Sequence, residues 1–364
     1  MHYEWTLKGT KFKKNRGTVF SCFSGGGGSS LGYKLAGFDV IGCNELDPRM
    51  MDTYLANNKP KYAYCESITD FRKRRKLPPE LFNLDILDGS PPCSSFSMVG
   101  SREKDWGKKK KFREGQAAQV LDTLFFEFIR LAKRLQPKII VAENVKGLIQ
   151  GKARAYADRI TSDMEMAGYK VKIYLLDASK MGVPQKRERV FFVGVRKDLN
   201  LAAPILEFCD KPVPFKLIRQ NVPKRLWSIS PACEDLYHLV KPGEAFSKAH
   251  PKGHFFSSKR LHKNKVISTI LPKSCFELHD HKHPRRIILK EGQLAQTFPL
   301  DYDFRKERPF YVIGMSVPPL MTARVAIEVY KQVLSKAKRK TVKRKLTGAY
   351  AYALGKKVKK AMRK

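Results

Sequence analysis

The sequence predicts an α/β protein built on a doubly wound, mainly parallel sheet, with a second, smaller and loop-rich domain. Short runs rich in β-branched and aromatic residues alternate with helical segments over the first 198 residues, and this alternation is typical of βα units. The first run, TVFSCF (18–23), leads directly into a glycine-rich turn and a helical segment, SGGGGSSLGYKLAG (24–37). The alternation stops after about residue 198, which predicts the second domain.

The predicted strands are apolar runs that end in polar or turn residues. Between the third and fourth of them, residues 120–137 place apolar side chains at helical spacing, and Pro137 ends that helix. In chain order, the segments predicted as strands with their exits are 18–23, 38–47, 84–92, 138–145, 169–178 and 189–196.

Several chemically informative residues come where these strands end. Ligands of doubly wound sheets bind beyond the carboxyl ends of the strands. The glycines 25–28, Glu45, Cys93 and Glu143 all fall at such ends. The pattern therefore predicts one site that gathers these residues at one edge of the sheet.

The second half of the chain is less regular. Residues 199–298 contain scattered Pro, His, Lys and Ser with only short apolar runs. Regular signals return at FYVIGMSVPPLMTARVAIEVYKQVL (310–334), which predicts a strand, a turn and a helix. We therefore divide the chain into a first domain (1–198), a loop-rich domain (199–298), a C-terminal segment returning to the first domain (299–334) and a basic tail (335–364).

Charge is the strongest compositional signal. The 364 residues include 72 Lys and Arg against 34 Asp and Glu, a formal net charge of +38. Such an excess predicts a polyanionic partner, and nucleic acid fits better than an acidic membrane surface. The tail is the extreme case, since residues 331–364 hold 14 Lys and Arg and no acid.

The cysteines and the apolar runs indicate the compartment. The 7 cysteines form no C-x-x-C pair, which disfavours a disulfide framework or a structural zinc site. No run approaches the roughly 18 uninterrupted apolar residues of a membrane span, and the N-terminus shows no apolar signal block. We expect a cytoplasmic, nucleoid-associated protein with no bound metal. HDHKHPRR (279–286) resembles a turn more than a metal site.

The glycine-rich turn and Glu45 together suggest a nucleoside. Glycines after a first strand let the backbone approach a ligand closely. A carboxylate at the end of the next strand can accept hydrogen bonds from both ribose hydroxyls. The pattern is not G-x-G-x-x-G, so no pyrophosphate is required, and adenosine attached to another group is compatible with it.

GSPPCSSFS (89–97) raises the question of whether Cys93 is a buried thiol or a nucleophile. Two prolines fix φ just before it, and an ordinary thiol is only slightly ionised at neutral pH. Glu143 in AENV and the pair Arg187 and Arg189 in QKRER are predicted to face the same cleft. A thiol, a carboxyl and two guanidiniums suit an electron-poor heterocycle that is attacked, protonated and held.

With these motifs in place, the chain resembles the DNA (cytosine-5)-methyltransferases, in the prokaryotic or phage form. The resemblance covers most of the chain and follows the family's order of motifs. These are FSGGGG (23–28), NELD (44–47), GSPPCSSFS (89–97), LFFEFIRL (124–131), PKIIVAENVKGL (137–148), QKRERVFFVG (185–194), QTFP (296–299) and GMSVPP (314–319).

The resemblance implies a catalytic set. Cys93 would add as thiolate to C6 of a cytosine flipped out of double-stranded DNA, and Glu143 would contact the N3 and N4 edge and supply a proton. C5 would then take a methyl group from S-adenosylmethionine, and loss of the C5 proton would expel Cys93. Arg189 would bind the base O2, and Arg187 would hold the active-site loops.

The resemblance also implies binding residues, in a protein expected to be monomeric. Residues 1–198 would be the catalytic and cofactor-binding domain, and 199–298 the target-recognition domain. The cofactor residues would be Phe23, Gly25, Gly27, Glu45, Leu46, Ser67, Ile68, Pro91 and Ser316. The DNA-binding residues would be Ser97, Arg102, Lys259 and Arg260, the first two in a loop, 97–115, that closes over the base.

Three positions depart from the family pattern, all toward the cofactor. Ser21 stands where an acid is usual, Ser67 replaces an aspartate that commonly meets the adenine amino group, and Met315 replaces an asparagine. Two other functions stay open: methylation of cytosine in RNA, and a DNA-binding module of the same fold that has lost catalysis. The presence of Cys93 and Glu143 with both arginines argues against the second.

Overall fold

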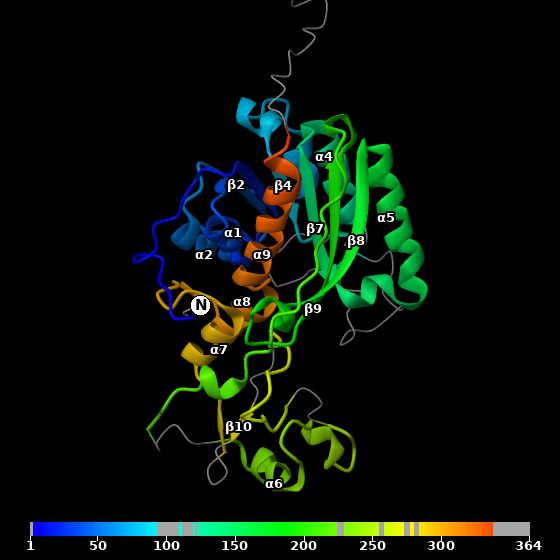
Figure 1. The fold of residues 1–364 in the computed structure, drawn as a ribbon. Helices are drawn as coiled ribbons and strands as arrows, with labels where there is room; N and C mark the ends of the chain where they lie inside the picture. The colour runs from blue at the N-terminus through cyan, green and yellow to red at the C-terminus, as the bar shows by residue number, and fades with distance from the viewer. Residues whose placement is uncertain are drawn as a thin grey trace, which may run out of the picture.

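The computed structural model describes residues 3–92, 109–110, 119–120, 123–223, 229–254, 258–272, 277–279 and 284–337. A central sheet of seven strands has the order β3-β2-β1-β4-β7-β9-β8 (Figure 1). The first five are parallel neighbours, whereas β9 runs antiparallel to both β7 and β8. The predicted doubly wound, mainly parallel sheet is therefore confirmed. The strands are β1 (Thr18–Cys22), β2 (Asp39–Glu45), β3 (Tyr62–Cys65), β4 (Ile86–Gly89), β7 (Ile139–Val145), β8 (Tyr169–Asp177) and β9 (Glu188–Arg196).

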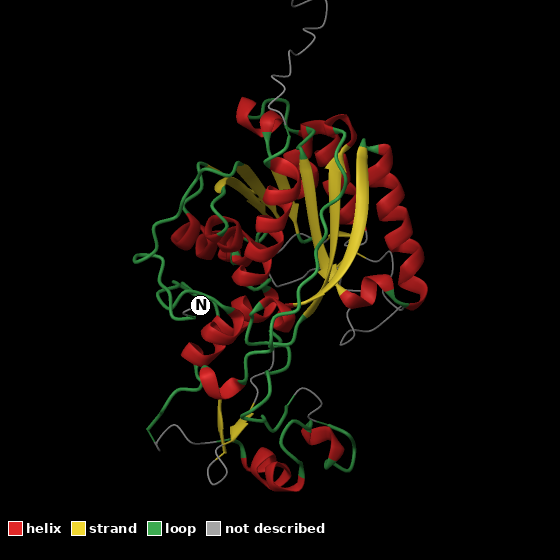
Figure 2. Ribbon diagram, viewed as in Figure 1, coloured by secondary structure: helices red, strands yellow, loops and turns green. Residues whose placement is uncertain are grey.

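Helices cover both faces of this sheet (Figure 2). Alternate residues of each central strand point to opposite sides, so Phe20 packs with α3, α4 and α5 while its neighbour Val19 packs with α1 and α9. Each layer has its own buried core, and the sheet is apolar on both faces, as parallel sheets require. The helices are α1 (Gly28–Leu35), α2 (Pro48–Asn58), α3 (Ile68–Lys73), α4 (Leu124–Leu135), α5 (Arg154–Met166) and α9 (Pro319–Val329).

Most of the segment 199–298 lies below the sheet in Figure 1 as loops and short elements, whereas residues 199–208 pack along the sheet. The short elements are α6 (Pro231–Leu239), the hairpin of β10 (Glu277–His279) and β11 (Pro284–Arg286), and α7 (Leu289–Gln296). Buried residues of α6 and Phe246 form a small core of their own. Another core joins Leu31 and Met50 to Phe215 and Leu294, so part of this segment packs directly on the first domain.

The prediction of a strand at 310–315 is wrong. Residues Pro309–Met315 form a helix, α8, and α9 follows after Ser316. Proline at the first helical position favours helix initiation, and a five-residue apolar run cannot by itself distinguish a strand from a buried helix. By length and composition Pro309–Leu334 could cross a membrane, but 72% of that apolar window is buried in the protein, as expected of core helices.

Candidate functional site

A cavity of about 390 Å³ opens at the carboxyl ends of the central strands. This volume lies within the range of small-ligand sites, which is roughly 300–1,000 Å³. Among the predicted residues, those that line it are Phe23, Gly25, Glu45, Leu46, Ile68, Pro91, Glu143, Arg187, Arg189 and Ser316. The strand ends thus bring together residues separated by up to nearly 300 positions in the sequence.

The glycine-rich turn forms one side of the cavity. Phe23 and Gly25 both have positive φ, at 52° and 48°, which is uncommon for a non-glycine residue and often marks functional sites. Gly27 differs from the prediction, since it does not line the cavity. It caps α1 with φ 81°, and a Cβ there would lie 2.2 Å from Asn58 Nδ2. The turn therefore requires glycine at this position.

Glu45 lies at the end of β2 with its carboxylate held by backbone amides. Oε2 accepts a hydrogen bond from the Gly25 amide at 2.8 Å, and Oε1 accepts one from Asp47 at 2.9 Å. Burial raises the pKa of this carboxyl. The lone pairs that remain can accept further donors, as the ribose hydroxyls of a nucleoside would require.

Ser67 does not line the cavity either. Its hydroxyl accepts the Asp70 amide at 3.1 Å and donates to the Asp70 carboxylate at 2.6 Å, so it caps the N-terminus of α3. Its neighbours Glu66 and Ile68 line the cavity instead. Glu66 was not predicted from the sequence, because which residue faces the cavity depends on where α3 begins.

Glu143 and Arg189 form a buried ion pair, and both side chains line the cavity. Arg189 Nε lies 3.0 Å from Glu143 Oε1, with the two side chains 15% and 10% exposed. Burial lowers the pKa of Arg189, while the Glu143 charge opposes that shift. The two residues come from neighbouring antiparallel strands, where Val145 is the cross-strand partner of Arg189.

Arg187 lies just before β9 and is 2% exposed. It donates hydrogen bonds to the carbonyls of Ile270 at 3.2 Å and Gly314 at 2.9 Å. It therefore ties the loop-rich segment and α8 to the edge of the sheet. Its Nε is buried with no hydrogen-bond partner among the described residues and belongs to a side chain that lines the cavity.

Asn144 was not singled out from the sequence. Its side-chain amide donates to the carbonyl of Pro91 at 3.1 Å and its oxygen accepts the Val145 amide at 2.8 Å. It thereby fixes the backbone two residues before Cys93. Cys93 itself, Ser97 and Arg102 lie outside the described residues.

The C-terminal segment closes the opposite side of the cavity. Ser316 lines it and is 7% exposed, with its hydroxyl donating to the Val312 carbonyl at 2.8 Å. Gln296, from the QTFP motif, donates to the Ser316 carbonyl at 2.7 Å. This segment also packs tightly against α1. A Cβ added to Gly28 would lie 2.4 Å from the Val317 carbonyl oxygen.

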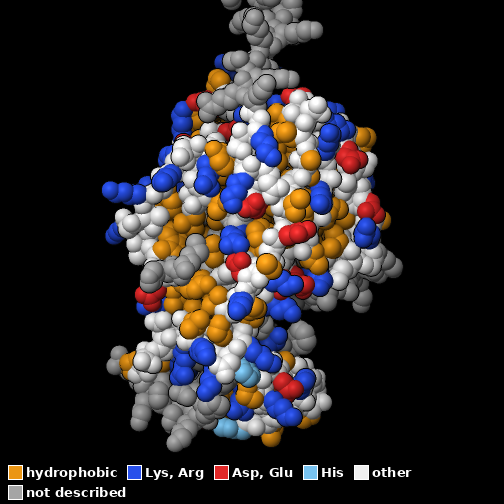
Figure 3. All heavy atoms as spheres, in the orientation of Figure 1, with side chains coloured by type: hydrophobic (Ala, Val, Ile, Leu, Met, Phe, Trp, Pro, Cys, Tyr) orange, Lys and Arg blue, Asp and Glu red, His pale blue; other side chains and the backbone are white. Residues whose placement is uncertain are grey.

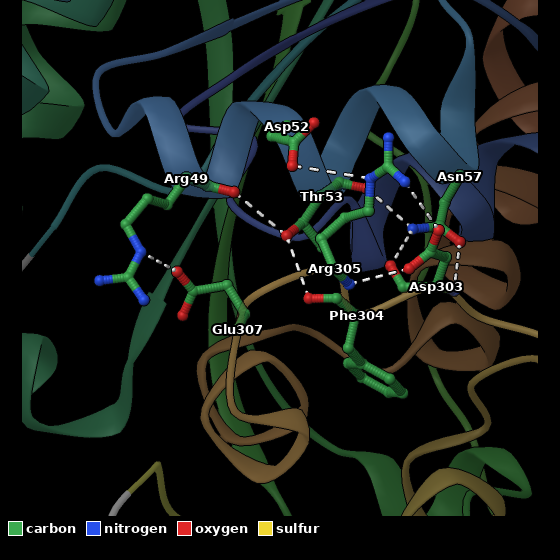
Figure 4. Close-up of polar contacts among 8 residues, drawn as sticks. All are labelled: Arg49, Asp52, Thr53, Asn57, Asp303, Phe304, Arg305 and Glu307. Carbon is green, nitrogen blue, oxygen red and sulfur yellow. Dashed lines mark hydrogen bonds and ion pairs between the residues drawn. The ribbon is translucent and has the colours of Figure 1, made fainter.

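Helix α2 holds this segment in place through a polar network (Figure 4). The Asn57 side chain donates to the Asp303 carbonyl at 2.8 Å and accepts the Asp303 amide at 2.9 Å. Arg49 and Glu307 form an ion pair at 3.0 Å at the other end of the helix. Because α2 also presents Met50 to the cavity, the network links two sides of the site.

Lys259 and Arg260, predicted to bind DNA, lie in the loop-rich segment. The Arg260 guanidinium packs over the Tyr237 ring at 4.4 Å and donates to the Tyr237 and Val240 carbonyls at 3.2 and 3.0 Å. These contacts turn it toward α6. Burial lowers the pKa of Lys259, and Lys186 adds to that shift. Among the described residues no group of three or more His, Cys, Asp or Glu is placed to hold a metal ion.

The doubly wound sheet, with a nucleoside-compatible cavity and a buried Glu–Arg pair at its strand ends, is an α/β fold of the kind that enzymes use to bind a nucleotide-like ligand. Residues 17–331 match the family model described as C-5 cytosine-specific DNA methylase. The chain belongs to this family.

Individual relatives support the assignment. Type II methyltransferase M.Eco47II of Escherichia coli is 37% identical over 342 residues, which covers 85% of this chain and 78% of that protein. Type II methyltransferase M.FnuDI of Fusobacterium nucleatum is 40% identical over 184 residues, so that in this match the chain spans about half of the relative (48%). A crystal structure assigned to a DNA modification methyltransferase of an E. coli prophage aligns with a TM-score of 0.65 at 23% identity, covering 86% of this chain and 99% of that one. This last likeness supports the fold alone.

Proposed function

We propose that this protein transfers a methyl group from S-adenosylmethionine to C5 of cytosine within a specific sequence of double-stranded DNA. The observation that supports it most directly is the Glu143–Arg189 pair at 3.0 Å, which borders the same cavity as Glu45 and the glycine-rich turn. A nucleoside-binding end and a base-binding end thus share one enclosed space.

The residues present suit S-adenosylmethionine. Glu45 would accept the ribose hydroxyls, while Phe23, Leu46, Ile68 and Pro91 offer apolar contact to the adenine. Ser316 would lie toward the methionine end. When bound, this cofactor supplies an electrophilic methyl group attached to a positively charged sulfur.

The base would be held and activated by the other end of the site. Glu143 would donate a proton to N3 while Arg189 binds O2, which makes C6 electrophilic toward the Cys93 thiolate. With Cys93 bonded to C6, C5 becomes nucleophilic and accepts the methyl group. Loss of the C5 proton to solvent and return of the N3 proton to Glu143 would then restore the ring and expel the Cys93 thiolate. Arg187 and Asn144 would keep this geometry by holding backbone carbonyls around the site.

The charge of the molecule supports a DNA substrate. Lysine and arginine side chains are spread across the visible surface, including the part that surrounds α6 (Figure 3), and the net charge is +38. A base inside a duplex must be extruded to be attacked, at a cost of a few kcal/mol that such contacts would offset. We further propose that residues 199–298 recognise the sequence, that the protein acts as a monomer, and that it works in the cytoplasm.

The test is to incubate the protein with S-adenosylmethionine and duplex DNA of mixed sequence, digest the DNA and measure 5-methyldeoxycytidine by mass spectrometry. We expect product with the wild type and none with Cys93→Ser, which should still bind DNA. Product on transfer RNA but not on DNA would favour RNA methylation. Cofactor and DNA binding with no product on either would favour a binding module.

A further inference from the structure

Asp88, on β4, is a buried carboxyl that the proposed reaction does not use. It is 3% exposed and lines the cofactor cavity. Parallel pairing of β1 and β4 places it directly beside Ser21. Position 21 is one of the three that depart from the family pattern, because a serine stands there in place of an acid. In this chain an acid enters the same region from the neighbouring strand.

The contacts of Asp88 leave its charge uncompensated. Ser21 Oγ donates to Oδ2 at 2.8 Å and Tyr33 Oη donates to Oδ1 at 3.1 Å. Both donors are neutral, and among the described residues no Lys, Arg or His forms an ion pair with Asp88. Burying a carboxylate without a counter-charge is costly. A cation supplied by a ligand in the cavity would remove that cost.

The position of Asp88 in the cavity indicates which cationic group of the cofactor would lie beside it. Glu45 lies at the nucleoside end and Glu143 at the reaction end, and Asp88 is close enough to Glu143 for the two charges to interact. The methyl group must point toward the reaction end, so the sulfur that bears it lies between the ribose and Glu143. The α-ammonium group of the methionine part lies farther along the chain of the cofactor.

We propose that Asp88 is the counter-charge for the sulfonium of S-adenosylmethionine and makes this site prefer the cationic cofactor over its neutral-sulfur product, S-adenosylhomocysteine. The inference rests on the proposed function. Asp88 is a positioning residue that takes no part in bond making.

The role of Asp88 can also be tested by measuring whether a proton is released when the cofactor binds. The pKa of Asp88 is raised to about 7, chiefly by burial, with Glu143 adding to the shift and the Ser21 and Tyr33 hydroxyls opposing it. The titratable groups facing it are Cys22 on β1, Tyr33 on α1, Tyr54 on α2 and Glu143 on β7. A cation beside Asp88 favours its ionised form. Binding of S-adenosylmethionine near pH 6.5 should therefore release a proton.

The experiment measures both ligands by isothermal titration calorimetry with the wild type, Asp88→Asn and Asp85→Asn. Asparagine keeps the size of Asp88 and one of its two acceptor oxygens, while its amide nitrogen can donate to the second hydroxyl once that hydroxyl rotates. Asp85 precedes the same strand at its opposite end, where it pairs with Lys138 at 2.5 Å, and so serves as a matched control. We expect Asp88→Asn to raise the dissociation constant of S-adenosylmethionine about tenfold and that of S-adenosylhomocysteine less than twofold. Asp85→Asn should change neither dissociation constant.

Titrations at pH 6.5 in two buffers of different ionisation enthalpy complete the test. The wild type should release a proton with S-adenosylmethionine only, and Asp88→Asn should abolish that release. Equal weakening of both ligands, or proton release that persists in Asp88→Asn, would overturn the inference. If the wild type binds neither ligand, the proposed function fails instead.

Discussion

Arg189 Nε lies 3.0 Å from Glu143 Oε1, and this pair connects the two central antiparallel strands β9 and β7 at the edge of the cavity. Both side chains are largely removed from solvent. The geometry orients the carboxyl of Glu143, and Arg189 Nη1 also donates a hydrogen bond to the Glu188 carbonyl at 2.8 Å. One buried ion pair therefore links β7 and β9 where these strands border the cavity.

Arg189→Ala should be strongly destabilising, because it leaves the Glu143 carboxylate buried without its partner. Loss of one member of a buried pair costs roughly 3–5 kcal/mol. Urea unfolding measures the change. The matched control is Arg154→Ala, which breaks an ion pair to Asp158 whose side chains are 67% and 62% exposed and should cost less than about 1 kcal/mol. Equal effects of the two substitutions would contradict a buried role for Arg189.

Gly28→Ala should separate α1 from the C-terminal segment. The added Cβ would lie 2.4 Å from the Val317 carbonyl oxygen and 2.8 Å from Ser316 Cβ, and the backbone cannot move aside at no cost. Overpacking of this kind costs roughly 1–3 kcal/mol. Because both segments line the cavity, the dissociation constant for S-adenosylmethionine should rise as well. Ser29→Ala, one residue along the same helix, should leave stability within about 0.5 kcal/mol.

Asn57→Ala should weaken the attachment of residues 303–307 to α2. It removes both side-chain bonds to the backbone of Asp303, and each lost hydrogen bond costs about 0.5–1.5 kcal/mol. We expect a lower melting temperature and weaker cofactor binding, measured by thermal shift with and without S-adenosylmethionine. Asp52→Ala is the control within the same network, since its ion pair with Arg305 is 3.6 Å long and its side chain is 55% exposed, so its loss should cost less than about 1 kcal/mol. A stability loss without weaker binding would show that the network in Figure 4 does not shape the cavity.

Removal of the basic tail should reduce non-specific DNA affinity and its salt dependence together. Truncation after residue 337 deletes 12 of the 14 Lys and Arg residues in 331–364. Each phosphate contact contributes about 0.9 to the slope of log K against log salt on duplex DNA. Fluorescence anisotropy at several salt concentrations measures that slope. An unchanged slope would mean that the tail makes no phosphate contacts.

The sequence predicted those features that depend on chain-local patterns. Alternating strands and helices predicted the sheet, and the strand ends predicted Glu45 and Glu143 at one site. The spacing in QKRER predicted that Arg189 faces the same cleft. Features that depend on pairing between distant segments were missed. The contact of Asp88 with Ser21 joins residues 67 positions apart and depends on the register of β1 and β4. Gly27 lies in a family motif and Ser67 at a position that departs from one, and in the structure each is the N-cap residue of a helix.

The pH dependence of stability offers a direct measure of Asp88. Its pKa is raised to about 7 in the folded protein, against about 3.9 in an unfolded chain. Between these values the folded state holds a proton that the unfolded state has lost. The free energy of unfolding contributed by this group therefore falls as pH rises from 4 to 7 and is constant above the folded pKa. Asp88→Asn should remove this dependence, making the variant more stable than the wild type at pH 8 by up to a few kcal/mol but not at pH 4. Urea unfolding of both proteins at pH 4, 6 and 8, with Asp85→Asn as the control, measures the difference. A difference that does not change with pH would mean that Asp88 is ionised throughout and already has a counter-charge within the protein.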